Sequence, residues 1–347
     1  MTSVAISETK RHVLLSLAGI LVAMPSLSQS PDNYGKAMAE FKARNYATAA
    51  TLFAAVETEK PGSTDAMLME GKCLVNLGNF PEAETSLRRY ISMHSNSDDA
   101  LYLLGFVLNR RNRPSESLAI YTKAATIKTP TADDLKIVGL NYVLLGDYPD
   151  AIKWLEKSVQ FDAKNHDAWY YLGRSYYSRG LLPEARNAFV KVLELNPHDA
   201  RAENNLGLIF ETEGKPDEAM QAYRTAIKWQ ETDIARSEQP YLNLGNLLIQ
   251  QDRLEEAIPL LEQAVQIAPK ESMCRLRLGV AYFRSKRLVE AQHELEEAIR
   301  LSPDSAAAHY QLGRFYKQIN SLDRAKDEFD RVEEIQSRAA RTKPPTP

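Results

Sequence analysis

The pattern of apolar and polar positions repeats along the chain with a period of about 34 residues, and a glycine marks each copy. A small residue follows each glycine twelve positions later, and a large apolar residue follows it sixteen positions later. The interval between successive glycines is constant, except that it is four positions longer between Gly207 and Gly245. The eight glycines are Gly71, Gly105, Gly139, Gly173, Gly207, Gly245, Gly279 and Gly313. A period of this length predicts an array of small stacked units rather than a single globular core.

Each unit carries apolar residues at helical spacing over two stretches of about 13 residues, with turn residues between them. Glycines that suit helix ends close the first stretch in four units: Gly78, Gly146, Gly180 and Gly214. Prolines that suit first helical turns open the second stretch: Pro81, Pro149, Pro183 and Pro216. Helices this short are marginal alone in water, so stacking of neighbouring units must stabilise them.

The recurrent glycine indicates close contact between the two helices of a unit, because glycine inside a helix costs about 1 kcal/mol relative to alanine. We expect the small residue twelve positions on to face it: Ala83, Ser117, Ala151, Ala185, Ala219, Ala257, Ala291 and Ala325. We expect the large residue sixteen positions on to face the next unit: Leu87, Tyr121, Leu155, Phe189, Tyr223, Leu261, Leu295 and Phe329.

One unit shows the complete pattern, reading Trp169-x-x-Leu172-Gly173-x-x-Tyr176, then Ala185-x-x-x-Phe189, then Pro197. This resembles the tetratricopeptide repeat at every signature position, and the resemblance extends from residue 30 to about residue 339. It implies an all-α fold, a right-handed superhelical solenoid of antiparallel helix hairpins. The nine expected repeats cover residues 30–63, 64–97, 98–131, 132–165, 166–199, 200–237, 238–271, 272–305 and 306–339.

The two ends of the array depart from the pattern. In the first repeat Ala37 replaces the glycine, as expected of a terminal capping unit. The last helix, expected from Asp323 to about Ala339, is unusually charged and should shield the other end. Residues 340–347 are predicted to be a disordered, Pro-rich tail. The four extra positions between Gly207 and Gly245 fall near residues 234–238. We expect them to form a loop insertion. A local change of superhelix pitch and a lip over a ligand-binding groove are the alternatives.

Residues 1–28 have the parts of a secretory signal peptide. Lys10 and Arg11 precede the apolar run Val13–Ala23, and small residues stand at Ser26 and Ser28. The run is shorter than the roughly 20 residues that span a bilayer comfortably. The sequence therefore predicts a signal peptide over residues 1–28 and export to the bacterial periplasm or beyond, with no membrane span after its removal. An uncleaved membrane anchor and a buried helix of a cytosolic protein are the alternatives.

Composition argues against several functional classes. The formal net charge of −3 supplies no excess of cations for nucleic acid. The two cysteines, Cys73 and Cys274, lie six repeats apart and form neither a disulfide framework nor a zinc signature. The six histidines lack metal-ligand spacing, and no phosphate loop or HExxH motif occurs. We therefore expect a non-catalytic protein without a cofactor.

The resemblance also implies that the first helix of every repeat lines a concave channel with six of its positions. In the N-terminal half these positions are mainly apolar: Leu68, Met69, Leu103, Phe106, Ile137, Leu140 and Val143, with Tyr102 and Lys72. Exposed apolar area of this kind usually has a partner. We expect it to receive an apolar ligand segment or to be closed by the degenerate first repeat.

The C-terminal half presents polar and aromatic residues at the same positions, and these form the predicted ligand site. They are Tyr170, Tyr171, Arg174, Tyr177, Asn204, Asn205, Asn243, Asn246, Arg277, Arg284, Tyr310, Gln311 and Arg314. Asparagines can bond both the donors and the acceptors of an extended peptide, and arginines pair with carboxylates. Tyrosines provide broad contact area that is typical of interfaces.

Two known variants of the family are not reproduced. Chaperone adaptors hold a carboxylate with five residues, of which only Asn243 and Arg277 match here, whereas Asn204, Leu208 and Met273 occupy the other places. Sugar-transferase arrays carry a long asparagine ladder, which only Asn205 and Asn243 continue. Neither specific ligand can be transferred to this chain.

The leading hypothesis is an exported scaffold or adaptor that binds a protein or peptide segment in the concave groove. The first alternative is a structural subunit of an envelope assembly, such as a polysaccharide-export or pilus machine. The second is a carbohydrate-binding channel that uses the tyrosines.

Overall fold

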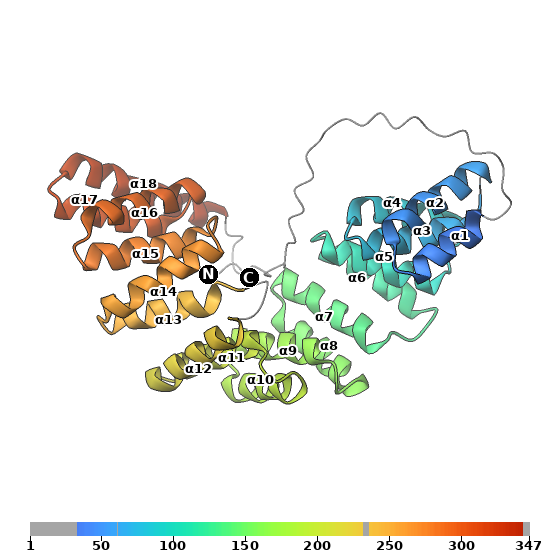
Figure 1. The fold of residues 1–347 in the computed structure, drawn as a ribbon, viewed down its shortest axis with the longest axis horizontal. Coiled ribbons are helices and arrows are strands. Elements are labelled where there is room, and N and C mark those ends of the chain that lie inside the picture. Colours follow the sequence, from blue (N-terminus) through green and yellow to red (C-terminus); the bar gives the residue numbers. More distant parts are fainter. Residues whose placement is uncertain (1–32, 61, 232–235, 343–347) are drawn as a thin grey trace. The chain divides into compact units, whose positions relative to one another are not determined.

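The computed structural model describes residues 33–60, 62–231 and 236–342. These residues form eighteen α-helices and no strand (Figure 1), which confirms the all-α prediction. The predicted signal peptide and residues 343–347 of the predicted tail lie outside the described part of the chain. None of the helices in the described ranges combines the length and apolar character needed to cross a bilayer.

The helices fall two to a predicted repeat, an A helix followed by a B helix. The A helices are α1 (Asn33–Lys42), α3 (Thr64–Asn76), α5 (Asp98–Arg110), α7 (Ala132–Leu145), α9 (His166–Ser178), α11 (Ala200–Thr212), α13 (Gln239–Gln250), α15 (Ser272–Arg284) and α17 (Ala306–Gln318). The B helices are α2 (Tyr46–Glu59), α4 (Phe80–Met93), α6 (Pro114–Ala125), α8 (Tyr148–Phe161), α10 (Leu182–Leu195), α12 (Pro216–Trp229), α14 (Leu254–Ile267), α16 (Leu288–Leu301) and α18 (Leu322–Thr342).

The helices divide into two compact units between residues 195 and 196. The N-terminal unit contains α1–α10 and the C-terminal unit contains α11–α18. Within each unit, every A helix packs on its own B helix, and the B helix packs on the next A helix. The core of the C-terminal unit is one continuous cluster of buried side chains that runs from Ala219 on α12 to Ala325 on α18.

The recurrent glycines pack against large side chains of their own hairpins. A methyl group added to Gly207 would lie 2.4 Å from Cε1 of Tyr223, and one added to Gly139 would lie 2.6 Å from Cγ of Leu155. Both large residues are fully buried. The prediction that the residue sixteen positions on faces the next unit is therefore incomplete, because its nearest contact is the glycine of its own A helix. Glycine is required because this side chain occupies the space of a Cβ.

Every turn between an A helix and its B helix contains one residue in the left-handed conformation. The sequence indicated this for the glycines, and Gly180 has a φ of 73°. The other five hairpins place non-glycine residues at the same register: Arg44, Asn112, Asp252, Lys286 and Asn320. The following N–H closes the turn, as when Arg287 donates to the carbonyl of Tyr282 at 2.9 Å. The hairpin imposes this conformation even where the side chain disfavours it.

The long interval and the C-terminus differ from the regular repeat. Gln230, which is buried after α12, donates to the carbonyl of Ser237 at 2.8 Å and accepts from its N–H at 2.9 Å. This side chain therefore joins the two ends of the inserted segment, of which residues 232–235 lie outside the described ranges.

The last helix, α18, runs to Thr342. Residues 340–342 are thus helical, in contrast to the disordered tail predicted for them.

Tyrosine–glutamate hydrogen bonds connect successive repeats at three places. Each tyrosine on an A helix donates to a glutamate on the preceding B helix: Tyr176 to Glu156 at 2.6 Å, Tyr282 to Glu262 at 2.6 Å and Tyr316 to Glu296 at 3.1 Å. Burial, followed by the hydrogen bond to the glutamate, raises the pKa of all three tyrosines. These contacts therefore stabilise the neutral phenol of each tyrosine relative to its phenolate.

We expect Gly207→Ala to lower the free energy of unfolding by about 1–2 kcal/mol. The overpacking cost against Tyr223 exceeds the roughly 1 kcal/mol that alanine adds to helix stability. Chemical denaturation measures the change. Gly71→Ala is the matched control, since its added methyl meets only the side chain of Leu87, at 3.0 Å, and should cost less. Equal losses in the two variants would contradict the proposed contact.

The raised tyrosine pKa values predict a loss of stability in alkali. Tyrosines ionise near pH 10 in the unfolded chain but at higher pH in the folded one, so the unfolded state loses protons first. The contribution of these tyrosines to the free energy of unfolding is therefore complete below about pH 10. It is lost as the pH rises through their pKa in the folded protein. Denaturation between pH 8 and 11 should show this slope, and Tyr176→Phe plus Tyr282→Phe should flatten it. A wild-type stability that stays constant over this range would contradict the raised pKa values of Tyr176 and Tyr282.

Candidate functional site

Five residues of the predicted site share neighbouring A helices of the C-terminal unit, and we call them the amide-arginine face. Asn204 and Asn205 lie on α11, Asn243 and Asn246 on α13, and Arg277 on α15. The helices α11, α13 and α15 contact one another in that order. One face therefore combines four carboxamides with one guanidinium.

Two of the asparagines bridge neighbouring repeats. Nδ2 of Asn243 donates to Oδ1 of Asn204 at 2.9 Å, and Asn204 is only 6% exposed. Asn205 donates instead to the carbonyl of Arg201 on its own helix at 2.7 Å. The bridge orients the carboxamide of Asn243, so that its oxygen remains available as an acceptor on a fixed scaffold.

The other two members contain buried polar atoms without a partner among the described residues. Oδ1 of Asn246 and Nε of Arg277 are both buried, and neither takes part in a hydrogen bond there. Burial lowers the pKa of Arg277, and no carboxylate counteracts this effect. Leaving such groups unsatisfied costs about 1–3 kcal/mol each. The face therefore offers one acceptor and one donor at a cost to stability.

The remaining predicted residues of the C-terminal unit have other surroundings. Arg284 donates to the carbonyl of Ile249 at 2.6 Å and to Oδ1 of Asp252 at 2.8 Å, which ties it to the end of α13. Arg314 is exposed and donates to Oε1 of the half-buried Gln311 at 3.4 Å. Tyr310 is 48% exposed. Arg284 thus stabilises the turn that follows α13, whereas Tyr310 and Arg314 lie on the open surface of α17.

The N-terminal unit holds the other four predicted residues, all on α9. Tyr170 is only 8% exposed, and its ring packs edge-on against Phe189 and Tyr171. The guanidinium of Arg174 lies 6.0 Å from the centre of the Tyr170 ring. Tyr177 is half-buried. Tyr170 therefore contributes to the core, and it does not provide the open contact surface expected of it.

The apolar positions of the N-terminal unit are also less open than expected. Leu68, Leu103 and Phe106 are partly buried and pack on the cluster formed by α3, α4 and α5. Ile137 is buried. The first repeat packs on the second through α2 and α3, as an end cap. The apolar side chains are thus covered largely by their own neighbours.

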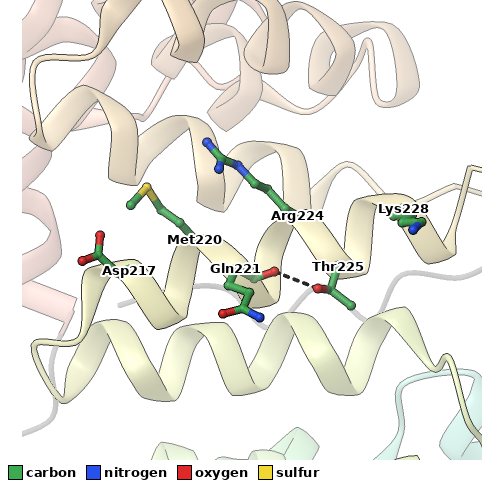
Figure 2. A pocket seen from close by; sticks show the side chains of 6 residues that line it. All are labelled: Asp217, Met220, Gln221, Arg224, Thr225 and Lys228. Carbon is green, nitrogen blue, oxygen red and sulfur yellow. Dashed lines mark hydrogen bonds between the residues drawn. The ribbon is translucent and has the colours of Figure 1, made fainter.

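A pocket that sequence reasoning did not anticipate lies along α12. Its volume is about 420 Å³. Figure 2 shows the six side chains that line it: Asp217, Met220, Gln221, Arg224, Thr225 and Lys228. All of them come from one helix, and Arg224 is paired with Glu256 at 3.4 Å. The pocket is a depression beside a single helix with side chains of mixed charge, and it brings together no set of catalytic groups.

The described residues include no cluster of three or more histidine, cysteine, aspartate or glutamate side chains that could hold a metal ion. Both cysteines are buried and free. Burial raises the pKa of Cys73 to about 11 and that of Cys274 to about 12. Both thiols therefore stay protonated near neutral pH, where only the thiolate would be a nucleophile.

Comparison with known families gives matches to tetratricopeptide repeat models over most of the array. One model matches residues 40–104, 210–276, 248–298 and 282–341. Two others match residues 170–234 and 139–180.

Two curated proteins illustrate the relatives. A TPR repeat-containing protein of Methanocaldococcus jannaschii is 25% identical over 170 residues, which are 46% of this chain and 30% of that protein. The type IV pilus assembly protein PilF of Pseudomonas aeruginosa is 34% identical over 116 residues, which are 33% of this chain and 44% of that protein. The matches thus span less than half of the length of each relative.

Two solved structures share the fold. The Cut9-Hcn1 hetero-tetramer of the APC/C matches with a TM-score of 0.58 and 16% identity, over 84% of this chain and 55% of that one. PilF of Pseudomonas aeruginosa matches with a TM-score of 0.52 and 19% identity, over 60% of this chain and 97% of that one.

We expect Arg284→Ala to lower the free energy of unfolding by about 1 kcal/mol. The variant loses two charge-assisted contacts at the end of α13, whose value solvent screening reduces at this partly exposed position. Thermal or chemical unfolding provides the measurement. Arg314→Ala is the control and should change stability by less than about 0.5 kcal/mol. Comparable stability of Arg284→Ala and Arg314→Ala would refute the structural role of Arg284.

Proposed function

Because the chain belongs to the tetratricopeptide repeat family, we propose that it is a non-catalytic scaffold that binds an extended segment of a protein partner. The segment lies along the amide-arginine face of α11, α13 and α15. The fold supports this role, since α11, α13 and α15 contact one another in order and together provide a long surface.

The observation that carries the proposal is the pair of unsatisfied atoms on this face. Oδ1 of Asn246 lacks a donor and Nε of Arg277 lacks an acceptor among the described residues. An extended peptide backbone presents one N–H and one C=O per residue, so it supplies both groups. The Asn204–Asn243 bridge supports the same function, since it holds an amide in place before binding.

We place this activity in the cell envelope of an exported protein. The support comes from the charged and apolar pattern of residues 10–28, together with similarity to PilF, which is a pilus assembly protein. The PilF similarity also favours a second candidate function, that of a structural subunit in an envelope assembly. In that case the B helices or the ends of the array would make the contacts.

Crosslinking in the native envelope followed by mass spectrometry first identifies the partner. Calorimetry then compares the wild type with the double variant Asn243→Ala plus Arg277→Ala. We expect the dissociation constant to rise about 10- to 100-fold, since each lost polar contact to a charged or amide group contributes roughly 1–3 kcal/mol.

The matched control changes a B helix instead, with Arg224→Ala plus Lys228→Ala on α12. It should bind the partner within about twofold of the wild type. Unaltered binding by the Asn243 and Arg277 double variant would refute the amide-arginine face. Loss of binding in the α12 variant alone would establish the structural-subunit function in its place.

A further inference from the structure

The last two hairpins of the C-terminal unit contain the same three-membered polar contact, with a different cation in each. On α15, the guanidinium of Arg275 donates to Glu294 of α16 at 2.9 Å and to the carbonyl of Pro269 at 3.3 Å. The counterparts of these residues, each 34 positions later, are His309, Glu328 and Pro303. Histidine therefore replaces arginine at one position of a repeated contact.

The ring of His309 faces the same two kinds of group as the guanidinium of Arg275. Its Nδ1 lies 2.5 Å from Oε2 of Glu328 on α18, and its Nε2 lies 3.0 Å from the carbonyl oxygen of Pro303. A carbonyl and an ionised carboxylate only accept hydrogen bonds, so both ring nitrogens have to donate. Only the imidazolium carries two N–H donors. The contact therefore fits a protonated His309.

The capping helix α18 has few other buried contacts. Ala325 is its one buried side chain among the described residues, whereas α16 buries three. Its arginines at 331 and 338 pair with Asp304, but the Asp304 side chain is 62% exposed, and ion pairs at the surface contribute little. The side chains of His309 and Glu328 are only 9% and 21% exposed. Theirs is the most buried ion pair between α17 and α18 in the described part of the chain.

The other charged groups around His309 belong to types that ordinarily titrate outside pH 5–8. They are Glu328, Arg331 and Arg338 on α18, Asp304 in the turn before α17, and Glu296, Glu297 and Arg300 on α16. The helix α15 meets α17 through the rings of Phe283 and Phe315. No cation other than His309 lies within ion-pair distance of Glu328 among the described residues. The charge of His309 is thus the one that changes near neutral pH.

We propose that His309 and Glu328 form a pH-sensitive latch, which fixes α18 on α17 while His309 is protonated and weakens as the pH rises. Histidine ordinarily changes charge between pH 5 and 8. Loss of the proton turns a nitrogen lone pair toward the carboxylate, so an attraction becomes a repulsion. The contact is complete at acidic pH and is lost in alkali, whereas arginine keeps its charge in the counterpart contact.

The latch controls whether this end of the array is closed. His309 and Gly313 stand one helical turn apart on α17, and a Cβ on Gly313 would lie 2.7 Å from Cε1 of Phe329 on α18. Arg324 of α18 lies 5.6 Å from the centre of the Tyr316 ring. Release of α18 uncovers this side of α17, which then resembles the open side of an internal repeat. The latch thus regulates the array independently of the amide-arginine face.

Hydrogen–deuterium exchange of the full-length protein, corrected for the intrinsic pH dependence of exchange, follows the opening of α18. We expect the opening constant of α18 to rise about 10-fold relative to that of α16 between about pH 5 and 8. His309→Arg reproduces the contact of Arg275 and should keep α18 protected at both pH values. His309→Gln should leave α18 poorly protected at both.

The protonation state of the ring provides an independent readout. At the acidic end of the range, nitrogen-15 NMR should show both ring nitrogens of His309 protonated, with the Nδ1 proton protected from solvent exchange. Glu328→Gln should remove that protection. His293→Gln is the matched control, since His293 lies on α16 and is 68% exposed. It should keep the wild-type pH profile of α18.

Protection of α18 that stays constant with pH in the wild type would overturn the latch, and this measurement needs no variant to fold. A wild-type pH profile in His309→Arg would also overturn it, because another group would then be responsible. A ring of His309 that is protonated at only one nitrogen at the acidic end would remove its physical basis.

Discussion

The contact between a helix glycine and a large side chain sixteen positions later holds every hairpin after the first together, and the rest of the array depends on it. Tyr223 against Gly207 and Leu155 against Gly139 leave no space for a Cβ. Both partners belong to one repeat, so each hairpin sets its own helix separation. Stacking then requires only that a B helix fit the next A helix. The outer surfaces of the helices can vary without disturbing this contact.

That freedom explains how polar groups accumulate on the A helices of the C-terminal unit. Some of them are used within the chain, as in the Asn204–Asn243 bridge and the capping of α13 by Arg284. Asn246 and Arg277 are different, since each leaves a buried polar atom unsatisfied among the described residues. Buried polar atoms normally have hydrogen-bond partners, and this face is an exception among the described residues. Such exceptions are expected where a protein binds its ligand.

Some features were predictable from sequence because they depend on local chemistry, and others were not. Glycines and prolines marked the ends of helices, and Gly180 occupies its turn in the left-handed conformation as its type allows. Lys286 and Arg44 adopt the same conformation without any signal in their residue type. Closure of the hairpin imposes it on them. The extension of α18 to Thr342 was likewise missed, since Arg and Ala tolerate both helix and coil.

The sequence by itself determined the period, the helix pairs and the set of residues that could reach a ligand, because each hairpin is specified within a single repeat. Only the tertiary structure decided which of those residues are available. Tyr170 is buried and Tyr310 is open, although both stand at the same position of their repeats. Asn204 meets Asn243, 39 residues later, and Arg284 bonds a carbonyl 35 residues earlier. Such contacts join different repeats, so no single repeat encodes them.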